Sequence, residues 1–354
     1  MTTDFEWLDG LSPWPREFGL DRMEALLAEL GDPQNAHPAV HVVGTNGKST
    51  AAVTVEQLLL SEGLSIGTTI SPHVASWSER IRLNGEEADF EEAVARVRPA
   101  AERLDATQFE IVTAAALAAF AAAQVDVAVV EAGLGGRLDA TNVLRTRVVL
   151  LTNVGLEHTD VLGDTVEDIA REKLAVAKQG SVVVLPDGTY ADFVAGHEVR
   201  IGGAREAAEA FVGHEIDADV EVALPGRLER RGAEVRDGAH NPDGMRYLVE
   251  RLRGSEPDGD YTVVTSILAD KDAHAMLGEL RRVGSRLVAT TSSSTRALPA
   301  AELAGLASAH FPHVEAVPDP LEALSRGHEL GEPVLVTGSL YLLGDLAQAE
   351  RPLR

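Results

Sequence analysis

Cysteine is absent from this chain of 354 residues. Disulfide bonds, thiolate nucleophiles and cysteine-ligated metal sites are therefore excluded. No apolar run is long enough to cross a bilayer, and the acidic stretch 1–10 lacks the basic start and apolar core of a secretory signal. These absences predict a cytoplasmic protein that does not enter a membrane.

Positive charge is also scarce. The chain has 31 Lys and Arg against 56 Asp and Glu, a net charge of −25. The summed field repels nucleic acids and anionic membranes, so neither is expected as a partner. An ATPase that acts on protein or nucleic acid is disfavoured, because no basic stripe is present. The carboxylates are dispersed, aromatics are few and arginine replaces lysine, which together suggest a halophilic source.

Lysine itself is the rarest of the charged residues. It occurs only at Lys48, Lys173, Lys178 and Lys271. Arginine cannot be deprotonated to act as an amine, so such a chain is expected to keep lysine where a primary amine or a compact ammonium group is needed. Three of the four lie in the motifs described below.

Short β-branched runs alternate with alanine-rich helical stretches along the chain. Residues 125–130 and 148–151 are typical of buried parallel strands, and 112–123 of a helix. The alternation weakens after Lys178 and restarts after position 228. We expect an α/β protein: a P-loop-type, mostly parallel sheet domain at 1–224, a hinge at 225–228 and a smaller Rossmann-like domain at 229–354.

A glycine turn with a lysine follows the first apolar run. Residues 44–50 read Gly-Thr-Asn-Gly-Lys-Ser-Thr and lead into a helical stretch. Backbone N–H groups and the helix N-terminus would face a polyanion there, with Lys48 as a point charge and Ser49 or Thr50 near phosphate or Mg²⁺. The general P-loop has glycine where this chain has Val42. The alternative is an ordinary strand-to-helix turn with a surface lysine.

Polar residues follow two later strands. Glu131 ends one run and opens a glycine-rich segment at 131–142, while His158 follows the next run. Ligands gather beyond the carboxyl ends of parallel strands, so both residues are candidate metal ligands. A plain glycine loop and a hydrogen-bonded loop histidine remain the alternatives. Lys173, in a helical stretch that starts near position 165, is either a functional amine or a surface lysine.

Similar residues follow strands in the second domain. Asp237 and His240 are expected to face an interdomain cleft and to grip a nucleotide from that side. Asn241 and Asp243 could be helix caps only. Lys271 and Ser339 follow two further strands at the same sheet edge.

Together these segments resemble the folylpolyglutamate synthase and dihydrofolate synthase family, relatives of the Mur peptide ligases. The likeness covers nearly the whole chain. The matching segments are 17–22, 44–50, 71–73, 78–82, 109–110, 131–142, 158–160, 171–173, 225–229, 237–244 and 337–343.

The resemblance implies an ATP-dependent amide ligase. ATP would phosphorylate a pteroate or folate carboxylate, and the amino group of L-glutamate would attack the acyl phosphate and release phosphate. Such chemistry needs cations and backbone donors more than a nucleophile. The implied small-molecule partners are dihydropteroate or folates, L-glutamate and ATP with Mg²⁺ at two sites, and the chain is expected to be a monomer.

The resemblance also implies a role for individual residues, with Lys48, Lys173 and His158 as the catalytic ones. Asn46, Gly47, Lys48, Ser49 and Thr50 would hold the ATP phosphates, and Arg227, Asp237 and His240 the nucleotide from the second domain. Ser71, Glu131 and His158 would bind Mg²⁺. Lys173 would be carbamylated by CO₂ and would bind a second Mg²⁺. Arg16, Glu17, Phe109, Leu138, Asp139 and Ala140 would line the pterin side, and Lys271 and Ser339 the glutamate.

The chain departs from the family pattern at two places. Ser49 stands where the family usually has glycine, which adds a hydroxyl without abolishing phosphate binding. About fifty residues separate Lys173 from Pro225. The family has a longer segment there, with a Gln-x-x-Asn-Ala helix whose Asn contacts ATP, and residues 203–208 lack that Asn. We therefore expect part of the first domain's peripheral sheet to be missing, and the adenosine contact is left open.

Three functions remain open at this point. The first is a dihydrofolate synthase, with or without folylpolyglutamate synthase activity. The second is a folylpolyglutamate synthase that accepts only tetrahydrofolates. The third is an inactive paralogue that binds nucleotide or pterin as a regulatory module.

Overall fold

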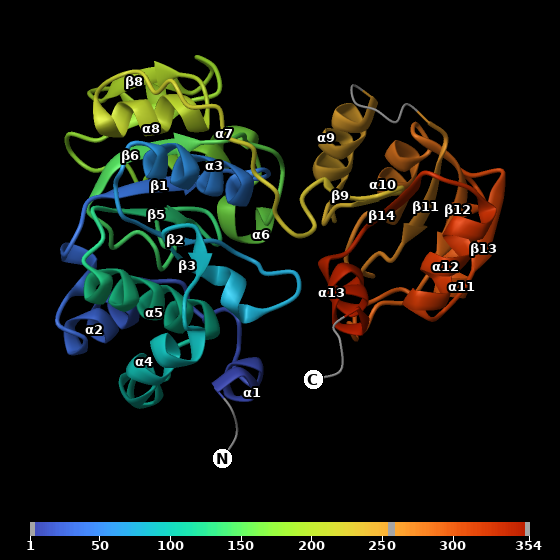
Figure 1. Ribbon diagram of the computed structural model, residues 1–354, viewed down its shortest axis with the longest axis horizontal. Helices are drawn as coiled ribbons and strands as arrows, with labels where there is room; N and C mark the ends of the chain where they lie inside the picture. Colours follow the sequence, from blue (N-terminus) through green and yellow to red (C-terminus); the bar gives the residue numbers. More distant parts are fainter. Residues whose placement is uncertain (1–3, 254–258, 351–354) are drawn as a thin grey trace. The chain divides into compact units, whose positions relative to one another are not determined.

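The computed structural model describes residues 4–253 and 259–350 of the chain. The chain forms two compact units, Met1–Val222 and Ala223–Arg354, and each unit has its own sheet (Figure 1). Both sheets are mixed but mostly parallel, which confirms the predicted α/β class. Within the described ranges, no helix is long and apolar enough to cross a membrane.

The sheet of the first unit has eight strands in the order β4-β3-β2-β5-β1-β6-β7-β8. Only the pairs β2–β3 and β3–β4 are antiparallel. The strands are β1 (Ala39–Val43), β2 (Ile66–Thr69), β3 (Ile81–Leu83), β4 (Glu86–Glu87), β5 (Val127–Glu131), β6 (Thr146–Leu151), β7 (Val182–Leu185) and β8 (Glu198–Ile201). The central strands are fully buried because helices cover both faces, which explains their continuous apolar runs.

The helices of this unit form two layers (Figure 1). The α-helices are α1 (Asp4–Asp9), α2 (Asp21–Glu29), α3 (Lys48–Ser61), α4 (Phe90–Leu104), α5 (Gln108–Ala123), α6 (Thr159–Leu162), α7 (Val166–Leu174) and α8 (Ala204–Val212). Helices α3 and α8 pack together on one face, and α4 and α5 on the other. Short 3₁₀ turns lie at η1 (Pro33–Asn35), η2 (Trp77–Arg80) and η3 (Ala191–Val194).

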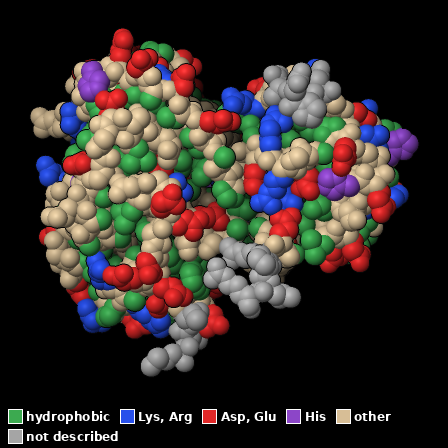
Figure 2. Space-filling model, viewed as in Figure 1, with side chains coloured by type: hydrophobic (Ala, Val, Ile, Leu, Met, Phe, Trp, Pro, Cys, Tyr) green, Lys and Arg blue, Asp and Glu red, His purple; other side chains and the backbone are tan. Residues whose placement is uncertain are grey.

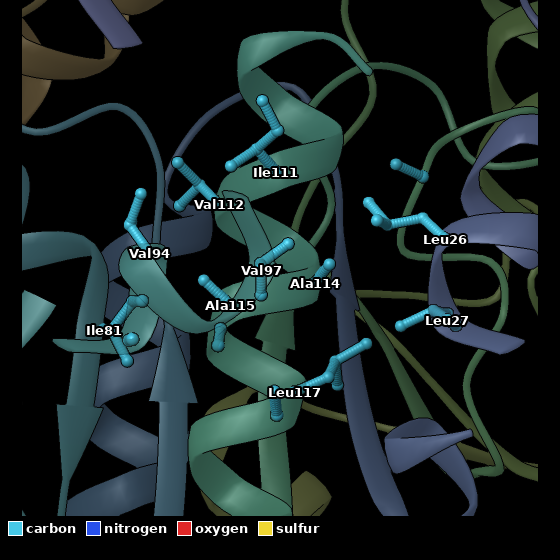
Figure 3. Close-up of a cluster of buried hydrophobic side chains, with 14 of the residues drawn as sticks. Leu26, Leu27, Ile81, Val94, Val97, Ile111, Val112, Ala114, Ala115 and Leu117 are labelled. Atoms are coloured by element: carbon cyan, nitrogen blue, oxygen red, sulfur yellow. The ribbon is translucent and has the colours of Figure 1, made fainter. Parts of the chain in front are cut away.

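The apolar side chains of α5 form the centre of the larger core (Figure 3). Ile111, Ala114 and Leu117 are fully buried against residues of α2 and α4. Alanine at so many positions of α5 lets the neighbouring helices approach closely. A capping box begins α5, because the Glu110 carboxylate accepts the Thr107 backbone N–H at 2.8 Å.

The second unit has a six-stranded sheet in the order β13-β12-β11-β14-β10-β9, with only β9 antiparallel. Its strands are β9 (Glu229–Arg231), β10 (Glu234–Arg236), β11 (Tyr261–Thr265), β12 (Gly284–Ala289), β13 (His313–Ala316) and β14 (Val334–Thr337). Its helices are α9 (Pro242–Arg253), α10 (Ala273–Leu280), α11 (Ala300–Ala307), α12 (Pro320–Leu330) and α13 (Leu340–Ala349). Helix α10 contacts α9 and α11, whereas α12 contacts α13.

Strand register decides where the polar loops of the first unit lie. Val42 pairs with Glu131 of β5, and Val43 pairs with Leu151 of β6. Strands β5, β1 and β6 are therefore neighbours that end at one level. The segments that follow them, which begin at residues 44, 132 and 152, emerge at the same edge of the sheet.

Candidate functional site

Residues 44–50, which we call the phosphate loop, join β1 to α3. Gly47 has φ +79° and directly precedes α3, a left-handed conformation that favours glycine. Gly44 has φ +150°, and a Cβ there would lie 1.9 Å from Thr152 Oγ1. Both glycines are thus required by the bend, and the first turn of α3 offers backbone N–H groups that a helix itself does not pair.

The phosphate loop is fastened to the segment that follows β6. The Asn46 backbone N–H donates to Asn153 Oδ1 at 2.8 Å, and Thr152 Oγ1 donates to the Asn46 carbonyl at 2.7 Å. Thr45 Oγ1 accepts the Gly155 backbone N–H at 3.0 Å. The loop therefore holds its shape through side chains of a neighbouring strand end.

Two lysines meet at one carbonyl of this loop. Lys48 Nζ donates to the Gly44 oxygen at 3.0 Å, and Lys173 Nζ donates to the same oxygen at 2.9 Å. Lys173 is only 1% exposed, so it is not a surface lysine. Its Nζ also lies 2.7 Å from Glu157 Oε1. Two ammonium groups are thus concentrated where the helix N-terminus already favours anions.

Burial shapes the protonation of this ion pair. It is the largest influence on Lys173 and lowers the pKa of its ammonium group below the ordinary value. Burial alone would raise the pKa of Glu157, but the neighbouring Lys173 and Lys48 charges outweigh it and lower that pKa. Glu157 is therefore the counter-ion of a buried amine that is easier to deprotonate than usual.

Glu131 and Ser71 lie side by side at the ends of β5 and β2. The Ser71 backbone N–H donates to Glu131 Oε2 at 2.9 Å, and Glu131 is only 3% exposed. The nearly buried Arg80 stacks on Trp77 at 4.4 Å and donates to His73 Nδ1 at 2.9 Å. Burial lowers the pKa of Arg80 to about 10, although the Glu131 charge acts in the opposite direction.

The protein would supply few ligands to a Mg²⁺ ion. No group of three or more His, Asp or Glu that could hold a metal occurs in the described part of the chain. Mg²⁺ is usually held by one or two carboxylates together with substrate phosphates and water, so the Glu131 carboxylate beside Ser71 and the phosphate loop fits that pattern. His158 is exposed, with φ +47° at the start of α6.

A separate hollow lies on the first unit beside α5. Its volume is about 780 Å³, and its lining includes Trp14, Arg16 and Glu17. The Trp14 ring lies 5.4 Å from the Phe109 ring, centroid to centroid. A Cβ at Gly133 would lie 2.5 Å from Phe109, so this aromatic pair contacts the segment directly after β5. The hollow and the Glu131 edge are therefore connected by packing.

We call residues 133–142 the glycine loop. Gly136 packs against α7, since a Cβ there would lie 2.6 Å from the carbonyl oxygens of Glu172 and Lys173. Of the three predicted pterin contacts in this loop, Leu138 is 44% exposed, whereas Asp139 and Ala140 are buried. The Asp139 carboxylate accepts the backbone N–H of Leu134 at 2.7 Å, so it is engaged within its own loop.

The polar residues of the second unit are also engaged locally. The Asp237 carboxylate accepts the backbone N–H groups of Leu228 and Ala239 at 2.8 and 2.9 Å, and burial raises its pKa. Arg227 lies beside Gly238, because a Cβ at that glycine would be 2.7 Å from Arg227 Nη1. His240 Nδ1 lies 2.8 Å from the Gly238 carbonyl oxygen.

The two residues predicted for glutamate differ in exposure. Ser339 is 1% exposed and begins α13, where its Oγ accepts the Tyr341 backbone N–H at 3.1 Å. Lys271 Nζ lies 3.3 Å from Asp270 Oδ2 and is partly exposed. Asn241 is a cap, since its Oδ1 accepts the Gly244 N–H at 2.7 Å.

Several residues of the site were missed from the sequence. Glu157, Asn153 and Arg80 had no predicted role. His41 also had no predicted role, although a histidine within the apolar run that precedes the phosphate loop is itself a signal. The helix α8, at the place of the missing Asn, buries Ala207 and Ala208, and its Arg205 donates to the Ile216 carbonyl oxygen.

Both units of the chain match known protein domains. Residues 42–210 match the Mur ligase middle domain, and residues 226–340 match the glutamate ligase domain of Mur ligases. The dihydrofolate synthase/folylpolyglutamate synthase of Mycobacterium tuberculosis is 33% identical, over 84% of this chain and 80% of its own. That alignment spans 389 positions, more than the 354 residues here, so it includes positions with no counterpart in this chain.

Two solved structures have nearly the same fold. One is E. coli FolC in complex with DHPP and ADP, with a TM-score of 0.89 and 26% identity, covering 98% of this chain and 97% of that one. The other is the bifunctional folylpolyglutamate synthase/dihydrofolate synthase with Mn, AMPPNP and L-glutamate bound. Its TM-score is 0.82 at 28% identity, and the match covers 97% of this chain and 96% of that one.

Proposed function

The chain belongs to the folylpolyglutamate synthase/dihydrofolate synthase family, the ATP-dependent glutamate ligases that act on folates, and we propose that its own acceptor is dihydropteroate. The main support for this proposal is that two features of the first unit, a phosphate loop and a hollow, are connected by packing. The phosphate loop with Lys48 and Lys173 lies at the sheet edge of Glu131, and the Trp14–Phe109 pair joins that edge to a hollow large enough for a pterin.

The proposed reaction has two steps. An oxygen of the acceptor carboxylate attacks the γ-phosphorus of ATP, and the bond to the β–γ bridging oxygen breaks as ADP leaves. The amine of L-glutamate then attacks the acyl carbon, loses a proton, and phosphate departs as the amide forms. Lys48, the N–H groups of Gly47, Ser49 and Thr50, and the Asn46 side chain hold the phosphates and stabilise their developing charge, since the Asn46 N–H is already donated to Asn153. Bound Mg²⁺ would neutralise phosphate charge, with Ser71, Glu131 and His158 as its protein ligands.

Lys173 is proposed as the site of carbamylation. The lowered pKa increases the share of neutral amine, which is the form that reacts with CO₂. A carbamate would be an anion next to Glu157, so the two would repel each other unless a second cation lay between them. The modification and a second Mg²⁺ site are therefore coupled in this proposal.

The remaining roles belong to the same proposal. Arg16, Glu17, Phe109 and Leu138 would contact the pterin, and Lys271 and Ser339 the glutamate. Arg227, Asp237 and His240 would contact the nucleotide. Acidic side chains are scattered over the visible surface (Figure 2), which supports a high-salt setting and predicts that activity persists at molar KCl.

The deciding experiment compares acceptors. Purified protein with ATP, Mg²⁺, bicarbonate and L-glutamate should release phosphate when dihydropteroate is added, and a glutamylated product of matching mass should form. Activity with tetrahydrofolate alone would replace the proposal by the tetrahydrofolate-specific alternative. If the protein binds nucleotide or pterin but turns over neither acceptor, the third function, an inactive paralogue, would replace the proposal.

A further inference from the structure

A histidine lies inside the central strand of the first sheet. His41 is the middle residue of β1, pairs with Val130 and Val149 of the neighbouring strands, and is 0% exposed. The other residues of β1 are alanine and valine. Burying an imidazole in place of an aliphatic side chain costs desolvation free energy. Its hydrogen bonds therefore decide whether it stabilises the structure.

His41 begins a chain of hydrogen bonds into the glycine loop. Its Nε2 lies 2.8 Å from Thr141 Oγ1, and the Thr141 hydroxyl in turn donates to Asp139 Oδ1. Thr141 is fully buried and Asp139 is 4% exposed. The carboxylate also accepts backbone N–H groups of the loop, from Leu134 at 2.7 Å and Thr141 at 3.0 Å.

With Asp139 ionised, the direction of this chain of hydrogen bonds sets the tautomer of His41. A threonine hydroxyl has one proton, and here it is donated to the carboxylate. Thr141 Oγ1 must therefore accept from His41, which requires the proton on Nε2. The other nitrogen, Nδ1, is buried with no hydrogen-bond partner. Burial and the nearby Lys178 charge lower the pKa of His41 to about 3, so the imidazole stays neutral.

Lys178 holds the end of the same loop. Its Nζ donates to the Asn142 carbonyl at 3.1 Å and to Asn142 Oδ1 at 2.7 Å. Asn142 Nδ2 donates to the Arg137 carbonyl at 2.8 Å. The glycine loop is thus fixed at two places, by His41 of strand β1 and by Lys178 in the segment that follows α7. This gives a role to the one lysine that the sequence motifs left unassigned.

We propose that His41 is a positioning residue for the acceptor substrate. Its imidazole, through Thr141 and Asp139, fixes the glycine loop against the strand that leads into the phosphate loop, and so presents Leu138 and the loop backbone to the pterin. This inference rests on the proposed function for the identity of the substrate. The hydrogen-bonded chain itself is independent of it.

The test compares two buried histidines of the same unit. His37 is 2% exposed, packs near Phe120, and both of its ring nitrogens lack hydrogen-bond partners. His41→Leu and Thr141→Val should each raise the KM for dihydropteroate about tenfold, the worth of one buried hydrogen bond, with nucleotide affinity unchanged. His41→Gln, which keeps a donor, should recover part of the loss, and His37→Leu should leave the KM unchanged.

A double variant tests whether the residues act as one chain. His41→Leu combined with Thr141→Val should cost no more than either change alone, because both remove the same link. Additive effects would overturn the proposal. A second result would also overturn it: His41→Leu leaves the KM unchanged and lowers the thermal stability by the same amount as His37→Leu. His41 would then contribute to packing only.

Two measurements do not depend on turnover. Amide hydrogen exchange across residues 133–142 should quicken in His41→Leu and Thr141→Val but not in His37→Leu. The ¹⁵N spectrum of the native protein should show His41 as the neutral Nε2–H tautomer from pH 5 to 8. An Nδ1–H tautomer, or unchanged exchange, would overturn the inference even if the ligase is active. If the ligase assay fails and both signatures hold, only the assignment of the substrate fails.

Discussion

The two sheets of this protein end in polar loops of different character. At the edge of the first sheet, two ammonium groups lie within 3.0 Å of one carbonyl oxygen, and one of them is almost completely buried. At the ends of the second sheet, Asp237 and Ser339 are engaged by backbone N–H groups, and the nearest lysine, Lys271, is partly exposed beside Asp270.

This difference indicates a division of labour. Lys173 is already paired with Glu157, so Lys48 and the N-terminus of α3 are the groups that suit the first edge to a polyphosphate. The second edge carries little uncompensated charge and suits a smaller, zwitterionic ligand such as an amino acid. In the proposed function, phosphoryl chemistry would belong to the first unit and binding of the glutamate amine to the second.

The largest expected effect follows from removing a cation of the first edge. Lys48→Ala should lower kcat/KM by about 10³-fold, because the transferring phosphoryl group loses a preorganised charge. The melting temperature should hardly change, since the hydrogen bonds of Lys48 go to carbonyl groups of its own loop. Phosphate release and thermal unfolding measure the two quantities. A variant with near-normal turnover would contradict the assignment of this edge to phosphate.

The next effect separates charge pairing from catalysis. Lys173→Met should destabilise the protein by about 3 kcal/mol, because Glu157 loses its buried partner. Lys173→Met with Glu157→Gln should recover most of that stability without recovering activity. Chemical denaturation and phosphate release are the measurements. Recovery of both would mean that the pair is only structural.

A smaller effect is expected at the second edge. Lys271→Ala should raise the KM for L-glutamate about tenfold and leave ATP affinity unchanged. Arg296→Ala is a matched control, because Arg296 Nη1 also lies 3.3 Å from Asp270 but on a more exposed side chain. If Lys271→Ala weakens ATP binding instead, the proposed division between the edges is wrong.

The smallest effect concerns pH. Burial alone would lower the pKa of His328, but hydrogen bonds to Glu234 and Glu332 raise it above 6.5. The stabilisation is therefore fully present below pH 6.5 and is lost as the pH rises through the raised pKa. Hydrogen exchange in α12 should quicken over that window, and His328→Gln should remove the dependence. In the first unit, burial lowers the pKa values of His41 and His73 to about 3, so these two histidines act in the opposite direction and cost stability as the pH falls below 6.5.

Part of the site was accessible from local sequence. The phosphate loop joins a strand to a helix within a few residues, so its glycines and its lysine can be recognised from the sequence. The fold class followed from short apolar runs and was confirmed. Glu131 was visible as an acid at a strand end. The family was also identified from ordered motifs, because each motif is contiguous in the chain.

Contacts between distant segments were not accessible in the same way. The pairing of Lys173 with Glu157 depends on where α7 lies relative to the end of β6. The inward orientation of Asp139 depends on Leu134 and Thr141, and the sequence alone suggested a substrate contact instead. The hydrogen bond of His41 is to Thr141, a residue 100 positions later.

The sequence by itself determined the alternation of strands and helices, the phosphate loop and the scarcity of lysine, because backbone conformation and side-chain chemistry are local properties. Only the tertiary structure decided which lysine is buried, which carboxylate faces it and which loop residue His41 contacts. Those outcomes depend on desolvation and hydrogen bonding between groups that the chain brings together only when it folds.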